Sequence, residues 1–263
     1  MHRLVVASGK GGVGTSVISS LTALSAAERE ERVLLVDASE SGGSLHHLFG
    51  VRPTHSLWML ADPRSFPDDT LIAIDDNLTL VAGGTSGAAV APVTDHERRA
   101  ALTRLAHVYE NFDIVVFDGG SRLDTISALS ELVDPSLLLV TSADRLALAA
   151  NYALVKSVRT RRADAAISVV ANRHGEALAA EACDFLVGAC SHFLGRTIDI
   201  VGAIPDDPCL EAAIGAGMTI RDALEGSPAA DTMRGILTRL IPVRSTAPRP
   251  TAVATSPFSR RWS

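Results

Sequence analysis

Short apolar runs alternate along the chain with longer helix-like segments. The runs are rich in Val, Leu and Ile, which is typical of parallel strands that are buried on both faces. The predicted strands cover residues 3–7, 32–37, 78–84, 113–118, 135–142 and 166–173. The predicted helices cover residues 16–29, 95–112, 123–132, 143–158, 176–194, 208–216 and 228–241, with a short helix inside 42–50. This alternation predicts an α/β fold with a doubly wound, mostly parallel sheet and helices on both faces.

Two stretches depart from the alternation. Residues 51–76 contain three prolines and are interpreted as an insertion with short helices of its own. Residues 243–263 hold four arginines and no acidic residue, and they are rich in Pro, Ser, Thr and Ala. We expect this segment to be disordered. The chain therefore divides into a folded domain over residues 1–242 and a basic C-terminal tail over residues 243–263.

A glycine-rich loop joins the first predicted strand to the first predicted helix. Residues 8–16 read Ser-Gly-Lys-Gly-Gly-Val-Gly-Thr-Ser, and strand, glycine loop and helix are the layout of a phosphate-binding loop. Glycines allow the backbone N–H groups to point at phosphate oxygens, and the helix dipole adds to the attraction. The hydroxyl of Ser16 is a candidate Mg2+ ligand. The candidate phosphate-binding residues are Gly9, Lys10, Gly11, Gly12, Val13, Gly14, Thr15 and Ser16.

This loop departs from the usual pattern, G-x-x-x-x-G-K-[ST], at one position. Thr15 stands where the lysine belongs, and a threonine cannot bring a charge to the β- and γ-phosphates. Lysine is rare in this chain, because 24 Lys+Arg include only Lys10 and Lys156. Lys10 inside the loop therefore indicates a place where a compact ammonium is required. A glycine-rich turn without a ligand is the alternative, and the strand and helix around the loop argue against it.

Two of the predicted strands end in an aspartate. Asp37 ends the run 32–37, and Asp118 ends the run 113–118. The carboxyl ends of parallel strands face the side on which ligands bind. Both carboxylates, together with Ser16, are therefore candidate Mg2+ groups. A capping role at the following turn is the alternative for each aspartate.

These motifs resemble the deviant Walker A ATPases of the MinD/ParA family, whose loop reads K-G-G-x-G-K-[ST]. The resemblance covers about residues 3–241 and implies that ATP or ADP binds with Mg2+. It further implies that Lys10 is the signature lysine, which reaches the partner's nucleotide across an ATP-dependent homodimer. Asp37 matches the first aspartate of the family's D-x-D switch motif, so Lys10 and Asp37 are the candidate catalytic residues. The second aspartate, which helps to position the attacking water, is Ser39 here.

The resemblance also assigns residues to the nucleotide base. The run 166–173 ends in Asn-Arg, as in the family, which implies that Asn172 reads the adenine edge. An amide suits this role because it offers both a donor and an acceptor. A Gly-x-Ile-Pro-x-Asp run follows later and is similar to the family loop that packs against the base. It places Pro205 and Asp206 there.

Within the family, the chain is similar to flagellar-number regulators of the FlhG (FleN) type. The likeness rests on the helix 176–194, its Phe-Leu-Gly end and the Gly-x-Ile-Pro-x-Asp run. It implies a switch for spatial or numerical control of a cell-surface organelle, the flagellum first, with a protein partner from the flagellar or pilus apparatus. Thr15 and Ser39 predict weak hydrolysis, because phosphoryl transfer depends on charge and positioning. The alternative is a degenerate, non-hydrolysing scaffold or sensor of the pilus-localisation (TadZ/CpaE) type.

Composition bears on compartment and partners. With 47% hydrophobic residues, 21% charged residues and a net charge of −6, the chain does not resemble a specific nucleic-acid binder. Three cysteines without disulfide or metal spacing indicate the cytoplasm. No apolar stretch in the sequence is long enough to span a membrane. The arginines and aromatics of the tail favour weak contact at the inner face of the cell membrane, whereas the apolar stripe of helix 228–241 suits either membrane contact or packing on the sheet.

Overall fold

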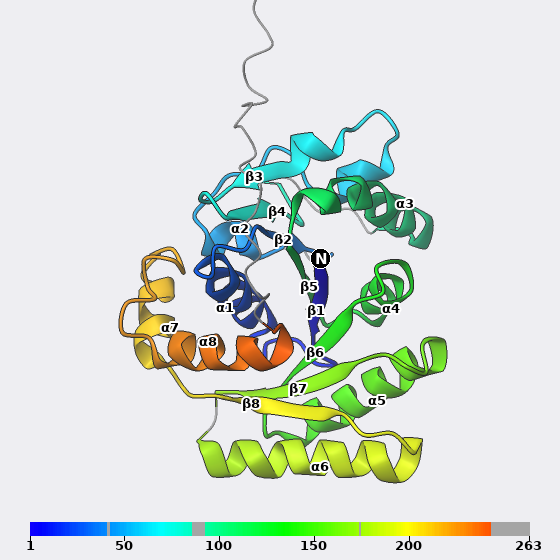
Figure 1. The fold of residues 1–263 in the computed structure, drawn as a ribbon, viewed down its shortest axis with the longest axis vertical. Helices are drawn as coiled ribbons and strands as arrows, with labels where there is room; N and C mark the ends of the chain where they lie inside the picture. The colour runs from blue at the N-terminus through cyan, green and yellow to red at the C-terminus, as the bar shows by residue number, and fades with distance from the viewer. Residues whose placement is uncertain (41–42, 86–92, 174, 243–263) are drawn as a thin grey trace, which may run out of the picture.

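One eight-stranded sheet forms the centre of the molecule (Figure 1). The computed structural model describes residues 1–40, 43–85, 93–173 and 175–242. Across the sheet the strands are ordered β3-β4-β2-β5-β1-β6-β7-β8, and every neighbouring pair is parallel except β3 and β4. The strands are β1 (His2–Ala7), β2 (Val33–Asp37), β3 (Leu71–Ala73), β4 (Leu78–Val81), β5 (Ile114–Gly120), β6 (Ser136–Thr141), β7 (Ile167–Asn172) and β8 (Asp199–Ile204). The predicted α/β fold with a mostly parallel sheet is confirmed.

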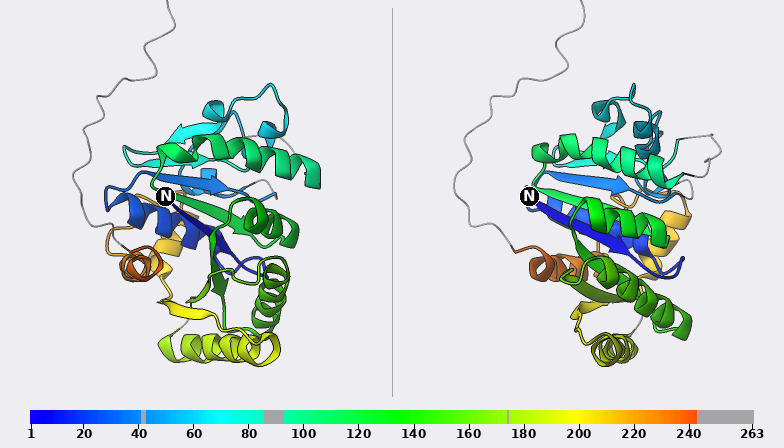
Figure 2. Two further views of the ribbon diagram at one scale, coloured as in Figure 1. Left: turned by 45° about the vertical axis from the view of Figure 1, so that its right-hand side comes forward. Right: turned by 90° about the vertical axis from the view of Figure 1, so that its right-hand side faces the viewer.

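Helices cover both faces of this sheet, as the two views of Figure 2 show. The α-helices are α1 (Thr15–Ala27), α2 (Leu45–Leu48), α3 (Asp95–Leu105), α4 (Leu123–Leu132), α5 (Arg145–Arg161), α6 (Glu176–Leu194), α7 (Pro208–Gly215) and α8 (Pro228–Leu240). Three 3-10 helices are η1 (Leu57–Ala61), η2 (Pro67–Thr70) and η3 (Ala106–Asn111). The single helix expected over 95–112 is therefore an α-helix that continues as the 3-10 helix η3.

The alternation of side chains along the strands divides the core into two layers. In β1, Val5 belongs to the cluster that packs against α3, α4, α5 and α6. Its neighbours Leu4 and Val6 belong to the cluster that packs against α1, α7 and α8. Successive strand residues point to opposite faces, so each buried strand contributes to both layers. Because both faces of the sheet are covered, the loops that follow the parallel strands meet at the edge formed by the carboxyl ends of these strands.

The predicted insertion contains one strand that its pattern did not indicate. β3 has three residues and pairs antiparallel with β4 at the edge of the sheet. Such a short strand is not distinguished from loop by alternation.

Helix α8 uses its apolar stripe for packing. Met233, Ile236 and Leu237 are buried in the core layer that includes α1. Arg234 on the flank of the stripe pairs with Glu28 at the end of α1, with 2.7 Å between Nε and Oε2. Of the two predicted uses of this stripe, the described structure shows packing. The predicted tail over residues 243–263 lies outside the described residues.

Helix α6 corrects the expectation that no apolar stretch reaches membrane-spanning length. Residues 177–194 have a mean hydropathy of 1.3 over 18 residues, which meets the length and composition needed to cross a membrane. Only 28% of this window is buried. The helix packs on α5, β7 and β8, and Phe185 and Phe193 project from it. Length and composition are all that this observation establishes.

Candidate functional site

The glycine loop between β1 and α1 adopts a conformation that requires glycine at two positions. Gly12 has φ of 83° and Gly14 has φ of 91°, both in the left-handed region. Gly14 forms the N-terminal cap of α1, and a Cβ placed there would lie 2.3 Å from Nδ2 of Asn172. Glycine therefore relieves both backbone strain and a steric conflict at this helix N-terminus.

The start of the loop is fixed to helix α5. A Cβ on Gly9 would lie 2.2 Å from the carbonyl carbon of Ala150, so the two backbones touch. The N–H of Gly9 donates to Oδ1 of Asn151 at 2.6 Å, and Nδ2 of Asn151 donates to the carbonyl of Val140 in β6 at 3.0 Å. Asn151 is fully buried. It thus links the glycine loop to the sheet, a role that the sequence did not indicate because a single polar residue within a helix forms no motif.

Lys10 turns toward the start of helix α5 in this structure. Its Nζ lies 3.0 Å from Oδ1 of Asp144, and both side chains are about two-fifths exposed. Asp144 also caps α5 by accepting the N–H of Ala147. Hydrogen bonds from Ser142 and Ala147, followed by the one from Lys10, hold the pKa of the Asp144 carboxyl well below its usual range. The pair is exposed enough to water that separating it costs little.

The two predicted aspartates lie side by side, because Asp37 and Asp118 are partners in the β2–β5 register. Both are fully buried. Asp37 accepts backbone N–H groups from Ser39, Ser44 and Leu45 at 2.9 to 3.1 Å. Burial raises the pKa of Asp37, and these hydrogen bonds oppose the rise. The predicted alternative, a capping role, is therefore present for Asp37, since its Oδ2 closes the loop onto the start of α2.

Asp118 is held less completely. Its Oδ1 accepts the N–H of Gly120 at 3.2 Å, whereas its buried Oδ2 has no hydrogen-bond partner of ordinary geometry among the described residues. Burial, and then the charge of Asp37, raise the pKa of Asp118 to about 7, although the hydroxyls of Ser16 and Ser19 lie near enough to oppose the rise. A buried carboxylate oxygen that lacks a partner is costly unless a proton or a cation compensates it.

These groups fit a divalent cation at the glycine loop. Ser16 is the second residue of α1, and its Oγ accepts a hydrogen bond from the hydroxyl of Ser44 at 2.8 Å. Hydroxyl and carboxylate oxygens are the ligand types that Mg2+ uses in phosphate sites. Ser16 and Asp118 would hold the ion, with Asp37 orienting the loop beside it.

A cavity of about 310 Å3 lies over the glycine loop. Of the predicted phosphate-binding residues, Gly11, Gly12, Gly14, Thr15 and Ser16 line this cavity. Ser39, the second position of the predicted switch motif, also lines it. The sequence did not indicate the other lining residues, which are Val17, Glu40, Gly119, Gly120, Ser121, Arg122 and Arg173. The cavity therefore joins the glycine loop to the segments that follow Asp37 and Asp118.

None of the three residues predicted at the base lines this cavity. Asn172 ends β7, and its Nδ2 donates to the carbonyl of Val13 at 2.8 Å. Pro205 lines a separate hollow with residues of α6 and β8, and Asp206 is exposed beside it. The next residue, Asp207, is buried and caps α7. A role in binding the base stays a prediction for Asn172, Pro205 and Asp206.

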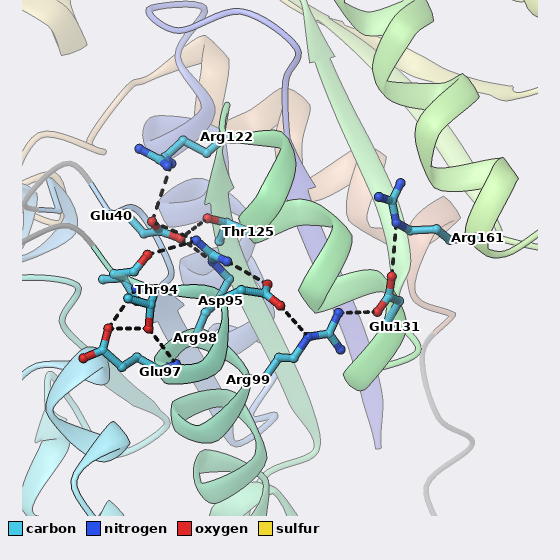
Figure 3. A network of polar contacts seen from close by, with 11 residues as sticks. Glu40, Thr94, Asp95, Glu97, Arg98, Arg99, Arg122, Thr125, Glu131 and Arg161 are labelled. Atoms are coloured by element: carbon cyan, nitrogen blue, oxygen red, sulfur yellow. Dashed lines mark hydrogen bonds and ion pairs between the residues drawn. The ribbon is translucent and has the colours of Figure 1, made fainter.

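A buried ion pair lies behind the loop that follows β2 (Figure 3). The carboxylate of Glu40 accepts hydrogen bonds from Nε of Arg98 at 2.6 Å and from Nη2 at 3.3 Å. Both side chains are almost fully buried. Thr125 of α4 donates to Oε1, and Nε of Arg122 lies 3.5 Å from Oε2. Glu40 is therefore engaged with α3 and α4, which keeps it from replacing the carboxylate that Ser39 lacks.

The fold, the glycine loop and the paired strand-end aspartates define a P-loop NTPase domain. Residues 1–72 match the sequence profile of the ParA family, described as NUBPL iron-transfer P-loop NTPase. The N-terminal part of the chain thus matches a ParA-family P-loop NTPase profile, which agrees with the resemblance noted in the sequence.

Individual relatives support the same class. Antiactivator FleN of Pseudomonas aeruginosa is 24% identical over 243 residues, which cover 89% of this chain and 84% of that protein. Flagellum site-determining protein YlxH of Helicobacter pylori is 24% identical over 153 residues, which cover 58% of this chain and 52% of that protein. The septum site-determining protein MinD from Pyrococcus horikoshii, solved with Mg-ADP, superposes with a TM-score of 0.72 at 18% identity, covering 92% of this chain and 96% of that one. At that identity the likeness shows the fold alone.

Proposed function

We propose that this chain binds ATP and ADP with Mg2+ at the glycine loop and acts as a MinD/ParA-like switch. The observation that carries the proposal is the buried Oδ2 of Asp118, which lies among the oxygens of Asp37 and Ser16 at the N-terminus of α1. The N–H groups of the loop and the helix dipole attract phosphates, and Mg2+ would compensate the buried carboxylates. The Mg-ADP complex of the similar MinD is consistent with this assignment.

Hydrolysis is proposed to be slow. Thr15 is neutral where the usual loop carries a lysine, and Ser39 provides no carboxylate to position water. Glu40 does not compensate, because Arg98 and Thr125 engage its carboxylate. The loss of one stabilising group typically adds about 3 to 4 kcal/mol to a reaction barrier. Lys10 offsets part of this loss only if it leaves Asp144 for a second subunit in an ATP-dependent homodimer.

The biological role is proposed from the relatives. FleN and the flagellum site-determining YlxH favour control of flagellar position or number, through a protein partner of that apparatus. A cytoplasmic protein with weak membrane contact through residues 243–263 fits this role. The alternative is a non-hydrolysing scaffold of the pilus-localisation type, which Thr15 and Ser39 favour.

The name of the matching profile suggests iron transfer, but the cysteines of this chain are poorly placed to bind an iron cluster. Cys183 and Cys190 are buried within α6, and burial raises the pKa of Cys183 to about 11. Cys209 is exposed in α7. Metal clusters are bound by several accessible thiolates that lie together, and the described residues hold no group of three or more metal-ligating side chains.

Calorimetric titration of the full chain with Mg-ATP and Mg-ADP, with light scattering of the same samples, tests the proposal. Tight binding of ATP with a shift from monomer to dimer supports the switch, and Asp118→Asn should weaken the Mg2+-dependent part of binding. Asp199→Asn, an exposed aspartate at the start of β8, is the matched control and should bind normally. No binding at millimolar ATP contradicts nucleotide binding and leaves the scaffold. Turnover equal to that of a relative with an intact loop, and abolished by Lys10→Ala, contradicts slow hydrolysis.

A further inference from the structure

The cavity over the glycine loop needs a positive charge that the loop does not supply. Thr15 is neutral, and Lys10 lies outside the cavity lining with its ammonium paired to Asp144. A bound triphosphate with Mg2+ keeps a net negative charge, which P-loop proteins neutralise with a lysine in the loop. Among the residues that the structure describes, the cations that line the cavity are Arg122 and Arg173.

Arg122 stands at the side of the cavity where a cation and terminal phosphate would meet. It lies two residues after β5, at the N-cap position of α4 and four positions after Asp118. Gly120 turns the chain there with φ of 59°, and a Cβ on Gly11 would lie 3.5 Å from Oγ of Ser121. The segment that carries Arg122 therefore faces the glycine loop. An Mg2+ ion held by Ser16 and Asp118 would lie at the terminal phosphates of a bound nucleotide. Arg122 lines the cavity on this side, together with Gly119 and Gly120, which directly follow Asp118.

Arg173 is placed differently. It follows Asn172 at the end of β7, and its Nη2 is paired with Oε1 of Glu211 in α7 at 2.6 Å. Asn172 contacts Val13 of the loop, and β7 lies on the opposite side of β1 from the two strands that end in the aspartates. A residue there is poorly placed to neutralise a terminal phosphate.

Arg122 is also free to move without cost to the buried network (Figure 3). Its side chain is 55% exposed, and its contact with Glu40 is 3.5 Å long. Glu40 keeps two hydrogen bonds from Arg98 and one from Thr125 when Arg122 leaves. Movement of Arg122 away from Glu40 therefore leaves no buried charge unpaired. Breaking a buried ion pair is costly only when a charge is left without a partner.

We propose that Arg122 binds the terminal phosphate of ATP in its own subunit. It would supply the positive charge that is missing from the loop because Thr15 stands at the lysine position. The proposal rests on nucleotide binding at this site. Guanidinium groups match phosphate oxygens with two parallel hydrogen bonds, so an arginine that reaches in from the β5–α4 segment can do the work of a lysine in the loop. In this structure Arg122 lines the cavity, and its Nε lies 3.5 Å from Oε2 of Glu40.

Calorimetric titration of the full chain with Mg-ATP and Mg-ADP tests the proposal. Arg122→Gln should weaken ATP binding by about tenfold or more and ADP binding by less than about threefold, because ADP lacks the phosphate concerned. Arg122→Lys should retain part of the affinity. Arg173→Gln, which removes a charge from the same cavity, is the matched control and should not discriminate between the two nucleotides. Adding Thr15→Lys to Arg122→Gln should restore ATP binding.

The outcomes separate this proposal from the one on which it rests. If the unaltered chain binds neither nucleotide, nucleotide binding and the role of Arg122 are both overturned. If the unaltered chain binds ATP and Arg122→Gln binds it equally well, only the role of Arg122 is overturned. The same conclusion follows if Arg122→Gln weakens ATP and ADP alike. Circular dichroism of each variant confirms that its fold is unchanged.

Discussion

The buried pair of Glu40 and Arg98 allows a sharp test of how the loop after β2 is stabilised. Arg98→Met keeps the length of the side chain and removes its charge. The carboxylate of Glu40, whose side chain is 3% exposed, then keeps only Thr125 and the long contact with Arg122. Removing one partner of a buried ion pair typically costs about 3 to 5 kcal/mol, because the other charge stays buried without compensation. The expected loss is thus a large share of a typical domain stability of about 5 to 15 kcal/mol.

The pH dependence of this loss follows from the pKa of Glu40. Burial alone raises that pKa, but hydrogen bonds from Arg98 and then from Thr125 outweigh it, so the folded protein has a lowered value. A lowered pKa contributes stability that is present above 4.5, the ordinary value for a glutamate, and disappears as the pH falls through the folded value. Without Arg98 the largest contribution that opposes burial is absent, so the pKa of Glu40 should be higher in the variant than in the unaltered chain. The folded variant then gains from protonation, so its deficit relative to the unaltered chain should shrink toward acidic pH.

Urea unfolding followed by circular dichroism, at about pH 8 and about pH 5, measures both effects. Arg99→Met is the matched control, because Arg99 pairs with Asp95 and Glu131 on the surface and is 43% exposed. Arg99→Met should lower the free energy of unfolding by less than about 1 kcal/mol. Glu40→Gln in the Arg98→Met background should recover part of the stability, since no buried charge remains. A loss for Arg98→Met no larger than that for Arg99→Met, or one equal at both pH values, refutes the reasoning.

Three further predictions concern the glycine loop and its aspartates. Gly9→Ala should lower the free energy of unfolding by about 1 to 3 kcal/mol, since the new Cβ meets backbone atoms of Ala150; urea unfolding that shows no change contradicts this packing. Asn151→Ala should cost about 2 to 5 kcal/mol in the same assay, because the N–H of Gly9 and the carbonyl of Val140 lose their partner; a loss within experimental error contradicts that link. The ligand-free chain should lose up to about 1.4 kcal/mol per pH unit between about pH 5 and pH 7, because folded Asp118, with a pKa of about 7, keeps a proton that the unfolded chain releases. Asp118→Asn should reduce the dependence of the unfolding free energy on pH. If urea unfolding of this variant shows an unchanged slope, the pH dependence arises from other groups.

The sequence predicted those parts of the site that follow from order along the chain. Asp37 and Asp118 could be placed at one edge because each ends an apolar run, and β2 and β5 are indeed neighbours in register. The glycine loop could be placed because it interrupts a strand and a helix. Element bounds differed from the prediction where packing decides them, as where α3 gives way to the 3-10 helix η3.

The remaining features depend on contacts between distant segments. Asn151 lies in the middle of α5, and nothing in its local sequence shows that it meets Gly9. Glu40 lies one residue from Ser39, where the family has a carboxylate. Only the packing of α3 shows that the carboxylate of Glu40 is bound by Arg98 instead. From the sequence, Arg122 is interpreted as an exposed cation at the start of a helix. The structure shows that the chain turns at Gly120 and that Arg122 lines the cavity. Each case is a long-range pairing, which periodicity and motif spacing do not encode.

The strand-end carboxylates also separate the two proposed roles physically. In a scaffold that never binds a cation, a proton would compensate the buried Oδ2 of Asp118, since burial and the charge of Asp37 raise the pKa of this carboxyl. A switch compensates it with Mg2+ held by the nucleotide, and this ion competes with the proton. For a switch, the stabilisation by Mg-ATP should therefore grow as the pH rises through 7, whereas a scaffold that binds no nucleotide gains nothing from Mg-ATP at any pH. Thr15 and Ser39 weaken chemistry, but they do not remove this need for a cation, and for that reason we favour a nucleotide-binding switch over a scaffold.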